Sequence, residues 1–384
     1  MISKLSVKNY KSIFDDSIEF SNVNVLIGEN GSGKSNYLEA MAMFSAANSN
    51  RLDISGLLEK GVRVTKPNLT LSSFLGKKNK NVIELNVIFK GLGQEVELKS
   101  NLIPEKENDI YTKWKDKNNI NVEISESKQE LLRKIAEENN EFLVKFGNSI
   151  FPYLEYRDSF FVPFLIYNLD TQALRGINNN SKVMPLGIYG EGLDVLLSDF
   201  SKEEWEELMG YNHLISWLDD IVIDKSDKLK FEGHKLGRST SILYFRDKYM
   251  SRKNNVFAAE NSNEGVLHIL FYLALFISKK TPKFFAIDNI ETALNPKLCR
   301  TIMKEIAALA VKHNKQVLIT THNPAILDGL NLNDDRQRLF IIKRTDEGFT
   351  KSERIKVKPS VDEINLKLSE MWMRGYLGGL PTNF

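Results

Sequence analysis

The stretch of sequence that decides the fold is Gly28-Glu29-Asn30-Gly31-Ser32-Gly33-Lys34-Ser35. It fits the pattern G-x-x-x-x-G-K-[ST], which forms a phosphate-binding loop when a strand precedes it and a helix follows. A mostly apolar run of strand length precedes it, formed by Val23, Val25, Leu26 and Ile27. Leu38, Met41 and Phe44 follow the loop at helical spacing. Because glycines let backbone N–H groups surround phosphate oxygens, this segment predicts a nucleotide site.

A second segment predicts that this site also holds a metal ion. Lys34 supplies a positive charge for phosphates, and the hydroxyl of Ser35 suits Mg²⁺. The apolar residues 284–287 end at Asp288, whose carboxylate would bind the hydration shell of the same ion. Alone, Asp288 could equally be a helix cap, so this interpretation depends on the loop upstream. We expect ATP and Mg²⁺ as cofactors, with Ser35 and Asp288 at the metal. The expected nucleotide contacts in this segment are Gly28, Glu29, Asn30, Gly31, Ser32, Gly33, Lys34, Ser35 and Asn36.

The order of apolar patterns predicts an α/β fold with a mostly parallel sheet. Residues 1–100 begin with strands and a helix and continue with two strand-like runs around residues 91–93, which indicate an antiparallel β wing. Residues 101–255 predict an inserted, mostly helical lobe with connecting strands. In residues 256–384, strand-like and helix-like segments alternate again, as expected for the second part of the ATPase domain. The helices expected there are 266–277 and 297–311, and the strands are 284–287, 316–320 and 339–343. The apolar stripe expected for the lobe is Leu131, Leu132, Ile135, Phe142 and Leu143.

Composition limits the classes of function. The chain has 384 residues, a formal net charge of +2 and one cysteine, Cys299. A near-neutral chain has no global electrostatic reason to bind DNA tightly, and a single cysteine excludes an internal disulfide. No run of about 18 apolar residues is present and residues 1–5 lack the apolar core of a signal peptide, so we expect a cytoplasmic protein without membrane contact.

Several segments resemble one known family, the ABC-type, AAA-family ATPases of the SMC, RecF and OLD (overcoming lysogenisation defect) group. The resemblance lies in residues 5–12 and 25–36, in Asp288-Asn289-Ile290-Glu291 with Leu294-Asn295-Pro296, and in Thr320-Thr321-His322-Asn323-Pro324. The last two segments resemble the Walker B and D-loop string and the switch-histidine loop. The resemblance implies the ABC-type P-loop fold, and implies that His322 contacts the γ-phosphate.

The same resemblance implies a dimer. Asn263-Glu264-Gly265 would be the signature segment, whose backbone amides contact the γ-phosphate held by the opposite subunit, so Asn263 and Gly265 join the expected nucleotide contacts. A homodimer or a higher oligomer of ATP-bridged dimers follows. Asn263 stands where the family usually has serine. The alternative is a simple helix cap formed by Ser262 or Asn263.

One departure from the family concerns hydrolysis. The family usually places a glutamate after the Walker B aspartate to polarise the attacking water, and this chain has Asn289 there. An amide cannot accept that proton. Hydrolysis is then slow, or Glu291 reaches the water by a shifted turn. The sequence leaves both alternatives open, and the expected catalytic set is Asn289, Glu291 and His322.

These features lead to one preferred function and several alternatives. OLD nucleases add a Toprim domain that needs a D-x-D pair, and this sequence contains none. The preferred hypothesis is a dimeric ATPase subunit of a bacterial anti-phage defence system that controls a separate nuclease or toxin. The alternatives are a RecF/SMC-like DNA-binding repair ATPase, an ATP-locked scaffold that does not hydrolyse, and a small-molecule kinase.

Three surface segments have no assigned role. The aromatic, glycine-rich tail at 369–381 either packs on its own domain or docks a partner. The lysine clusters at 77–80 and 279–283 are either solvated surface or phosphate contacts.

Overall fold

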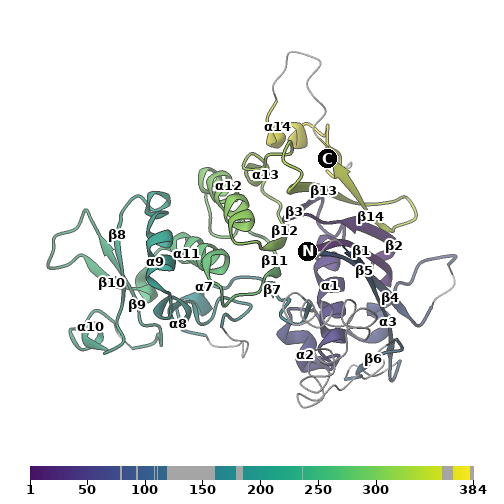
Figure 1. Cartoon of the computed structure of the whole chain (residues 1–384), viewed down its shortest axis with the longest axis horizontal. Coiled ribbons are helices and arrows are strands. Elements are labelled where there is room, and N and C mark those ends of the chain that lie inside the picture. The colour runs from purple at the N-terminus through teal and green to yellow at the C-terminus, as the bar shows by residue number, and fades with distance from the viewer. Residues whose placement is uncertain are drawn as a thin grey trace, which may run out of the picture.

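The computed structural model describes residues 1–77, 80–91, 94–107, 109, 111–118, 161–178, 185–235, 237–356 and 366–380. Within them, the central element is a six-stranded sheet with the order β14-β13-β3-β12-β11-β7 (Figure 1). Every neighbouring pair is parallel except β13 and β14, so the predicted mostly parallel sheet is confirmed. The strands are β3 Val23–Ile27, β7 Ile166–Tyr167, β11 Phe284–Ile287, β12 Gln316–Thr320, β13 Gln337–Arg344 and β14 Thr350–Ile355.

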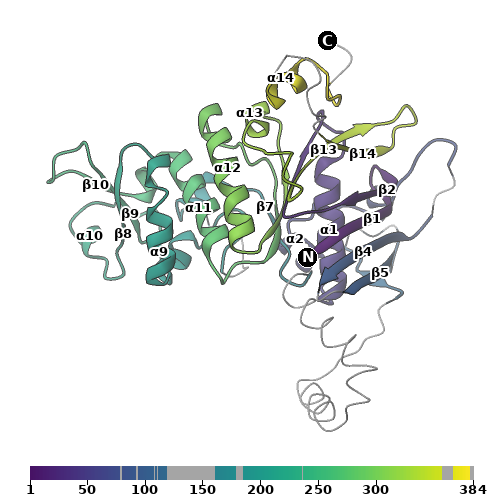
Figure 2. The same ribbon diagram turned by 45° about the horizontal axis from the view of Figure 1, so that its top comes forward.

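Helices cover both faces of this sheet, because its strands are apolar on both sides. Alternate residues of β3 belong to different cores: Val25 packs with α11 (Glu264–Ile277) and α12 (Pro296–Lys312), whereas Leu26 packs with α1 (Lys34–Asn48). Figures 1 and 2 show α11 and α12 on one side and α1 on the other. This layering brings the ends of β3, β11 and β12 to one edge of the sheet.

A second sheet forms the antiparallel wing, with the order β2-β1-β4-β5-β6. Its strands are β1 Ile2–Tyr10, β2 Ile13–Glu19, β4 Ile83–Gly91, β5 Gln94–Pro104 and β6 Trp114–Asp116. The first strand of the chain, β1, belongs to this wing, where it pairs with β2 and β4. Leu5 and Val7 are buried, whereas Ser6 is half-buried and Lys8 is exposed, which is typical of an antiparallel strand with one solvated face. The predicted hairpin between β4 and β5 is confirmed.

The region between the wing and α11 contains more strand than the prediction of a mostly helical lobe included. Strands β8 Leu218–Ile223, β9 Leu243–Asp247 and β10 Val256–Ala258 form a three-stranded antiparallel sheet. Strand β7 from the same region joins the central sheet beside β11. The predicted apolar stripe at 131–143 lies outside the described residues, and the division at residues 100 and 255 stays a prediction. The helices that the structure describes in this region are α7 Thr171–Leu174, α8 Leu193–Ser198, α9 Lys202–Met209, η3 Asn212–Leu214, α10 Lys228–Phe231 and η4 Ala259–Asn261.

The C-terminal tail packs on its own domain in the part that the structure describes. Helix α14 (Leu368–Met373) lies against α13 (Pro324–Leu327), as Figure 2 shows. The backbone N–H and the hydroxyl of Ser369 donate to Asp328 at 3.0 and 2.8 Å, and Trp372 is buried in the core. The remaining helices are α2 Ile54–Glu59 and α3 Pro67–Thr70. Among the described helices, none combines the length and the hydropathy needed to cross a bilayer.

Candidate nucleotide-binding site

The phosphate-binding loop connects β3 to α1, as the sequence predicts, and two of its glycines are required by close contacts. Gly28 and Gly33 have φ of 150° and 104°. A Cβ atom at Gly28 would lie 2.1 Å from the carbonyl oxygen of Ile342, and one at Gly33 would lie 2.4 Å from Oγ1 of Thr350. No side chain fits at these distances. The loop is therefore formed against β13 and β14, and its shape depends on glycine at both positions.

Lys34 lies in the loop with its ammonium group held by loop carbonyls. Its Nζ donates to the carbonyl oxygens of Gly28 at 2.9 Å and Glu29 at 3.0 Å. Burial lowers the pKa of Lys34 to about 8, against the opposing effect of the nearby carboxylates of Asp288, Glu291 and Glu29. A bound phosphate would add negative charge beside this ammonium and favour its protonated form.

Ser32 tests whether the loop fits a phosphate. Its Oγ is buried and has no hydrogen-bond partner among the described residues, although such groups are normally paired. This hydroxyl lies beside the first glycine of the loop, because a Cβ atom at Gly28 would approach it to 3.0 Å. A phosphate oxygen accepts such hydrogen bonds, so an unpaired donor within the loop segment fits the nucleotide that the motif predicts.

The two expected metal ligands meet across the edge of the sheet. Ser35 Oγ donates to the two carboxylate oxygens of Asp288 at 3.3 and 3.2 Å, and Thr320 Oγ1 also donates to Asp288. A hydroxyl and a carboxylate are oxygen donors of the kind that Mg²⁺ prefers. In the described part of the chain, no group of three or more His, Cys, Asp or Glu side chains is arranged to hold a metal. The remaining ligands of a magnesium ion would be phosphate and water oxygens.

The three expected catalytic residues lie around the same edge. Asn289 has a φ of 55°, and its N–H donates to Thr320 Oγ1 at 2.9 Å, so the chain turns sharply after β11. Glu291 accepts the backbone N–H of His322 at 2.9 Å through Oε1, while its Oε2 is buried without a partner among the described residues. Burial, and then the charge of Lys34, lowers the pKa of His322. Glu291 therefore has an unpaired carboxylate oxygen in the field of Lys34.

Asn263 forms the N-cap of α11, as the alternative interpretation of the signature segment predicts. Its Oδ1 accepts the backbone N–H of Gly265 at 2.8 Å. A Cβ atom at Gly265 would lie 3.1 Å from the carbonyl oxygen of Ala293, so the start of α11 lies against the turn that follows Glu291. A contact of Asn263 or Gly265 with a nucleotide of a second subunit stays a prediction.

The sequence did not predict the residues that surround Ser35 and Asp288, the two expected metal ligands. A cavity of about 190 Å³ is lined by Ser35, Asp288, Asn168 and Tyr189 among others. Asn168 follows β7, the strand beside β11, and so lies at the same edge as Asp288. The only sequence signal is a short apolar run before Asn168, which does not distinguish a two-residue strand from a loop.

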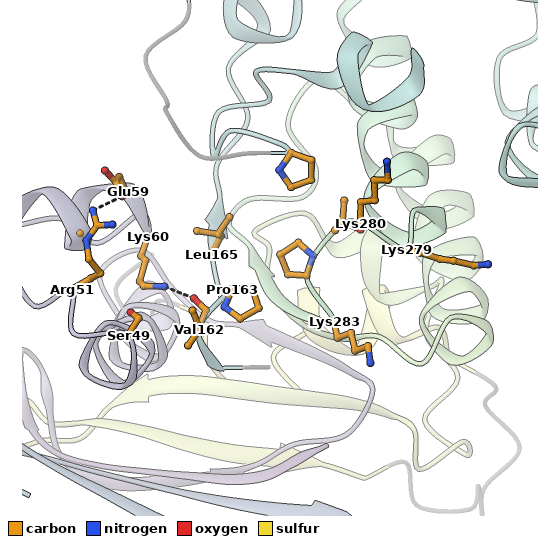
Figure 3. Close-up of a pocket in the computed structure, with 14 residues that line it drawn as sticks. Ser49, Arg51, Glu59, Lys60, Val162, Pro163, Leu165, Lys279, Lys280 and Lys283 are labelled. Atoms are coloured by element: carbon orange, nitrogen blue, oxygen red, sulfur yellow. Dashed lines mark hydrogen bonds and ion pairs between the residues drawn. The ribbon is translucent and has the colours of Figure 1, made fainter. Parts of the chain in front are cut away.

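A larger cavity of about 410 Å³ collects cationic residues, including the lysine cluster at 279–283 (Figure 3). Most of these cations follow a helix end. Lys60 is the C-cap residue of α2, Arg51 follows the end of α1, and Lys279 and Lys280 follow the end of α11. Cations at helix C-termini interact favourably with the helix dipole. Lys60 also donates to the carbonyl oxygen of Val162 at 2.7 Å, so its ammonium group already has a partner in the fold.

Two family models match the chain. The model described as AAA ATPase domain matches residues 1–160. The model described as AAA domain, putative AbiEii toxin, Type IV TA system, matches residues 218–328. The first range contains the phosphate-binding loop, and the second contains Asp288 and His322. Both parts of the divided site therefore lie in matched regions.

Curated relatives match over a short part of the chain. The DNA replication and repair protein RecF of Bacillus cytotoxicus is 36% identical over 92 residues, 23% of this chain and 24% of that protein. The RecF protein of a Geobacillus species is 43% identical over 51 residues, 13% of this chain and 14% of that protein. The matches thus span about a quarter or less of these relatives.

Solved structures match over nearly the whole chain. The SMC head domain from Thermotoga maritima has a TM-score of 0.52 and 13% identity, covering 93% of this chain and 99% of that one. An SMC head bound to the C-winged helix domain of ScpA has a TM-score of 0.54 and 15% identity, covering 93% and 98%. At these identities the likeness shows the fold, which is that of an SMC head. The two family models, the RecF relatives and this fold together support an ABC/SMC-class ATPase of the AAA family.

Proposed function

We propose that this protein binds ATP with Mg²⁺ at residues 28–36 and hydrolyses it slowly. The observation that carries the proposal is the meeting of Ser35 with Asp288 beside the buried ammonium of Lys34. Lys34 and the unpaired hydroxyl of Ser32 would hold phosphate oxygens, and Ser35 and Asp288 would hold the metal. Mg²⁺, when bound, neutralises negative charge on the phosphates.

For hydrolysis, we assign the proton-accepting role to Glu291. Asn289 cannot accept a proton, and its backbone N–H is used by Thr320. Glu291 has one carboxylate oxygen fixed by the N–H of His322 and one oxygen unpaired. The unpaired oxygen would accept the proton of the attacking water once nucleotide and water are bound at this edge of the sheet. Since the usual glutamate position is occupied by an amide, turnover is slow compared with relatives that have glutamate there.

The finer proposal is an ATP-bridged homodimer that regulates a separate effector. The backbone N–H groups at the start of α11 would meet the γ-phosphate of the opposite subunit, through Asn263 and Gly265. Support for an anti-phage defence role comes from the family model over residues 218–328, whose description names a putative toxin of a toxin–antitoxin system. The effector would be a nuclease or a toxin on another chain, as the OLD-like resemblance suggests.

A second candidate is a RecF-like DNA-binding repair ATPase, which the RecF relatives favour. The formal net charge of +2 gives it little electrostatic support. Duplex DNA binding whose affinity falls steeply with salt would favour this candidate over the regulator. A third candidate, an ATP-locked scaffold, rests on Asn289 and predicts ATP that stays intact after purification.

The test combines phosphate release with solution mass. We expect wild-type protein to form a dimer only with ATP and to release phosphate slowly, and Lys34→Ala to lose both properties. Lys202→Ala is the matched control, because its side chain is 86% exposed on α9, and it should keep both. Tight ATP binding without phosphate release would contradict the ATPase function and favour the ATP-locked scaffold. A mass that does not respond to ATP would contradict the dimer.

A further inference from the structure

We propose that Thr350 of β14 is a positioning residue for the nucleotide, because its hydroxyl group fixes the phosphate-binding loop in the conformation that receives phosphate. The inference rests on the proposed ATP binding. Thr350 lies 316 positions from Lys34 in the sequence, on β14, whereas the loop follows β3. Thr350 touches the loop and not the expected phosphate position, so it acts through the loop.

The first observation is a chain of hydroxyl groups that ends on the loop. Asn36 Nδ2 donates to Ser12 Oγ at 2.7 Å, Ser12 Oγ lies 2.6 Å from Thr350 Oγ1, and Thr350 Oγ1 donates to the carbonyl oxygen of Ser32 at 2.7 Å. Because Thr350 gives its one hydroxyl proton to Ser32, Ser12 must be the donor in the middle bond. Each bond in the chain is therefore directed toward the loop.

The second observation is that this chain is buried and tightly fitted. Thr350 and Ser32 are fully buried and Ser12 is nearly so. The N–H of Thr350 also donates to the carbonyl oxygen of Ser12 at 2.8 Å, which fixes the strand against the wing. Gly33 has no room for a Cβ atom beside Thr350. No water-filled alternative is available to a carbonyl this deeply buried, so loss of the Thr350 hydroxyl would leave the Ser32 carbonyl unpaired.

The third observation is a separate contact that provides a control. Asp16 of β2 accepts from Tyr37 Oη at 2.5 Å and from the N–H and Oγ of Ser352 at 3.1 and 2.5 Å. Ser352 is two residues from Thr350 on the same strand, and its hydrogen bonds go to Asp16 and Ser17 of β2 instead of the loop. Thr350 and Ser352 thus attach the same strand to different neighbours, and only Thr350 holds a loop carbonyl.

The experiment compares Thr350→Val, which keeps shape and removes the hydroxyl, with Thr350→Ser, which keeps the hydroxyl. Ser12→Ala breaks the chain one step earlier, and Ser352→Ala is the control. A fluorescent ATP analogue reports Kd, steady-state turnover separates KM from kcat, and thermal unfolding reports stability. We expect Thr350→Val and Ser12→Ala to raise Kd and KM about tenfold with kcat little changed. Thr350→Ser and Ser352→Ala should bind ATP like wild type.

The inference is overturned when folded Thr350→Val or Ser12→Ala binds ATP like wild type. It is also overturned when Thr350→Ser loses as much affinity as Thr350→Val, since shape and not the hydroxyl would then matter. If Thr350→Val does not fold, Ser12→Ala and Thr350→Ser decide by the same criteria. Wild-type protein that binds no ATP would instead contradict the proposed function, which is a distinct result.

Discussion

At the scale of single residues, the central group is the ammonium of Lys34. Burial lowers its pKa to about 8, and the loop carbonyls of Gly28 and Glu29 hold it in place. The group that would attract phosphate is therefore close to losing its charge in the free protein. Its protonated form is what a nucleotide would bind.

This predicts a pH dependence of ATP affinity. Lys34 is protonated below about pH 8 and neutral above it in the free protein, so ATP affinity should fall as pH rises from 7.5 to 9.5. Titration calorimetry in buffers with different ionisation enthalpies should show proton uptake on binding near pH 8. The arginine of Lys34→Arg stays charged between pH 7.5 and 9.5, so the ATP affinity of this variant should change little with pH. A wild-type affinity that stays constant to pH 9.5 would contradict this assignment.

Substitutions of Glu291 and Asn289 should change turnover in opposite directions. Glu291→Gln removes the unpaired carboxylate oxygen and should lower kcat about 10²-fold while ATP binding persists. Asn289→Glu restores the usual base and should raise kcat. Single-turnover phosphate release measures both variants beside wild type. Unchanged turnover in Glu291→Gln would show that another group accepts the proton.

At the scale of elements, helix α11 depends on its cap. The Oδ1 of Asn263 accepts the N–H of Gly265, so Asn263→Ala should lower the free energy of unfolding by about 1 kcal/mol. Asn263→Ser keeps a capping oxygen and should remain near wild type. Urea unfolding measures both variants. Equal stability of Asn263→Ala and wild type would mean that this cap contributes little.

The C-terminal tail offers a matched pair of glycines. Gly378 and Gly379 have φ of 74° and 73°, but a Cβ atom at Gly379 would lie 2.6 Å from Cγ2 of Ile341 and 3.5 Å from Cα of Gly28, whereas Gly378 faces open space. Gly378→Ala should cost about 1 kcal/mol through its backbone alone. Gly379→Ala should cost more and should also weaken ATP binding. Equal unfolding free energies for the two variants would contradict the close contact with Ile341.

At the scale of the whole molecule, the site joins two ends of the chain. Strand β3 and the loop come from the first 35 residues, and Asp288, Thr320 and Thr350 come from the last third. Figure 1 shows N-terminal strands β1 and β2 beside β14 near the other end. A site built this way exists only when both ends have folded together.

The sequence predicts the motif-bearing parts of this molecule well. Strands β11 and β12 have the predicted bounds. Helix α11 begins two residues before its predicted start and ends where predicted, and α12 is one residue longer at each end. Strong periodicity and a spacing fixed by phosphate chemistry explain this success. Strand β7 was missed because two residues carry no periodicity. Thr350 was missed because its contact with Ser12 joins residues 338 positions apart, and local pattern gives no sign of it.

Calorimetric titration of ATP into wild-type protein and Asp288→Asn, each with excess Mg²⁺ and with EDTA, tests the Mg²⁺–ATP site directly. We expect wild type to bind ATP more tightly with Mg²⁺, because Ser35 and Asp288 hold the ion beside the phosphates. Asp288→Asn should lose this gain and keep the weaker binding seen in EDTA. Absence of ATP binding by wild type, or a full Mg²⁺ gain in Asp288→Asn, would contradict the site.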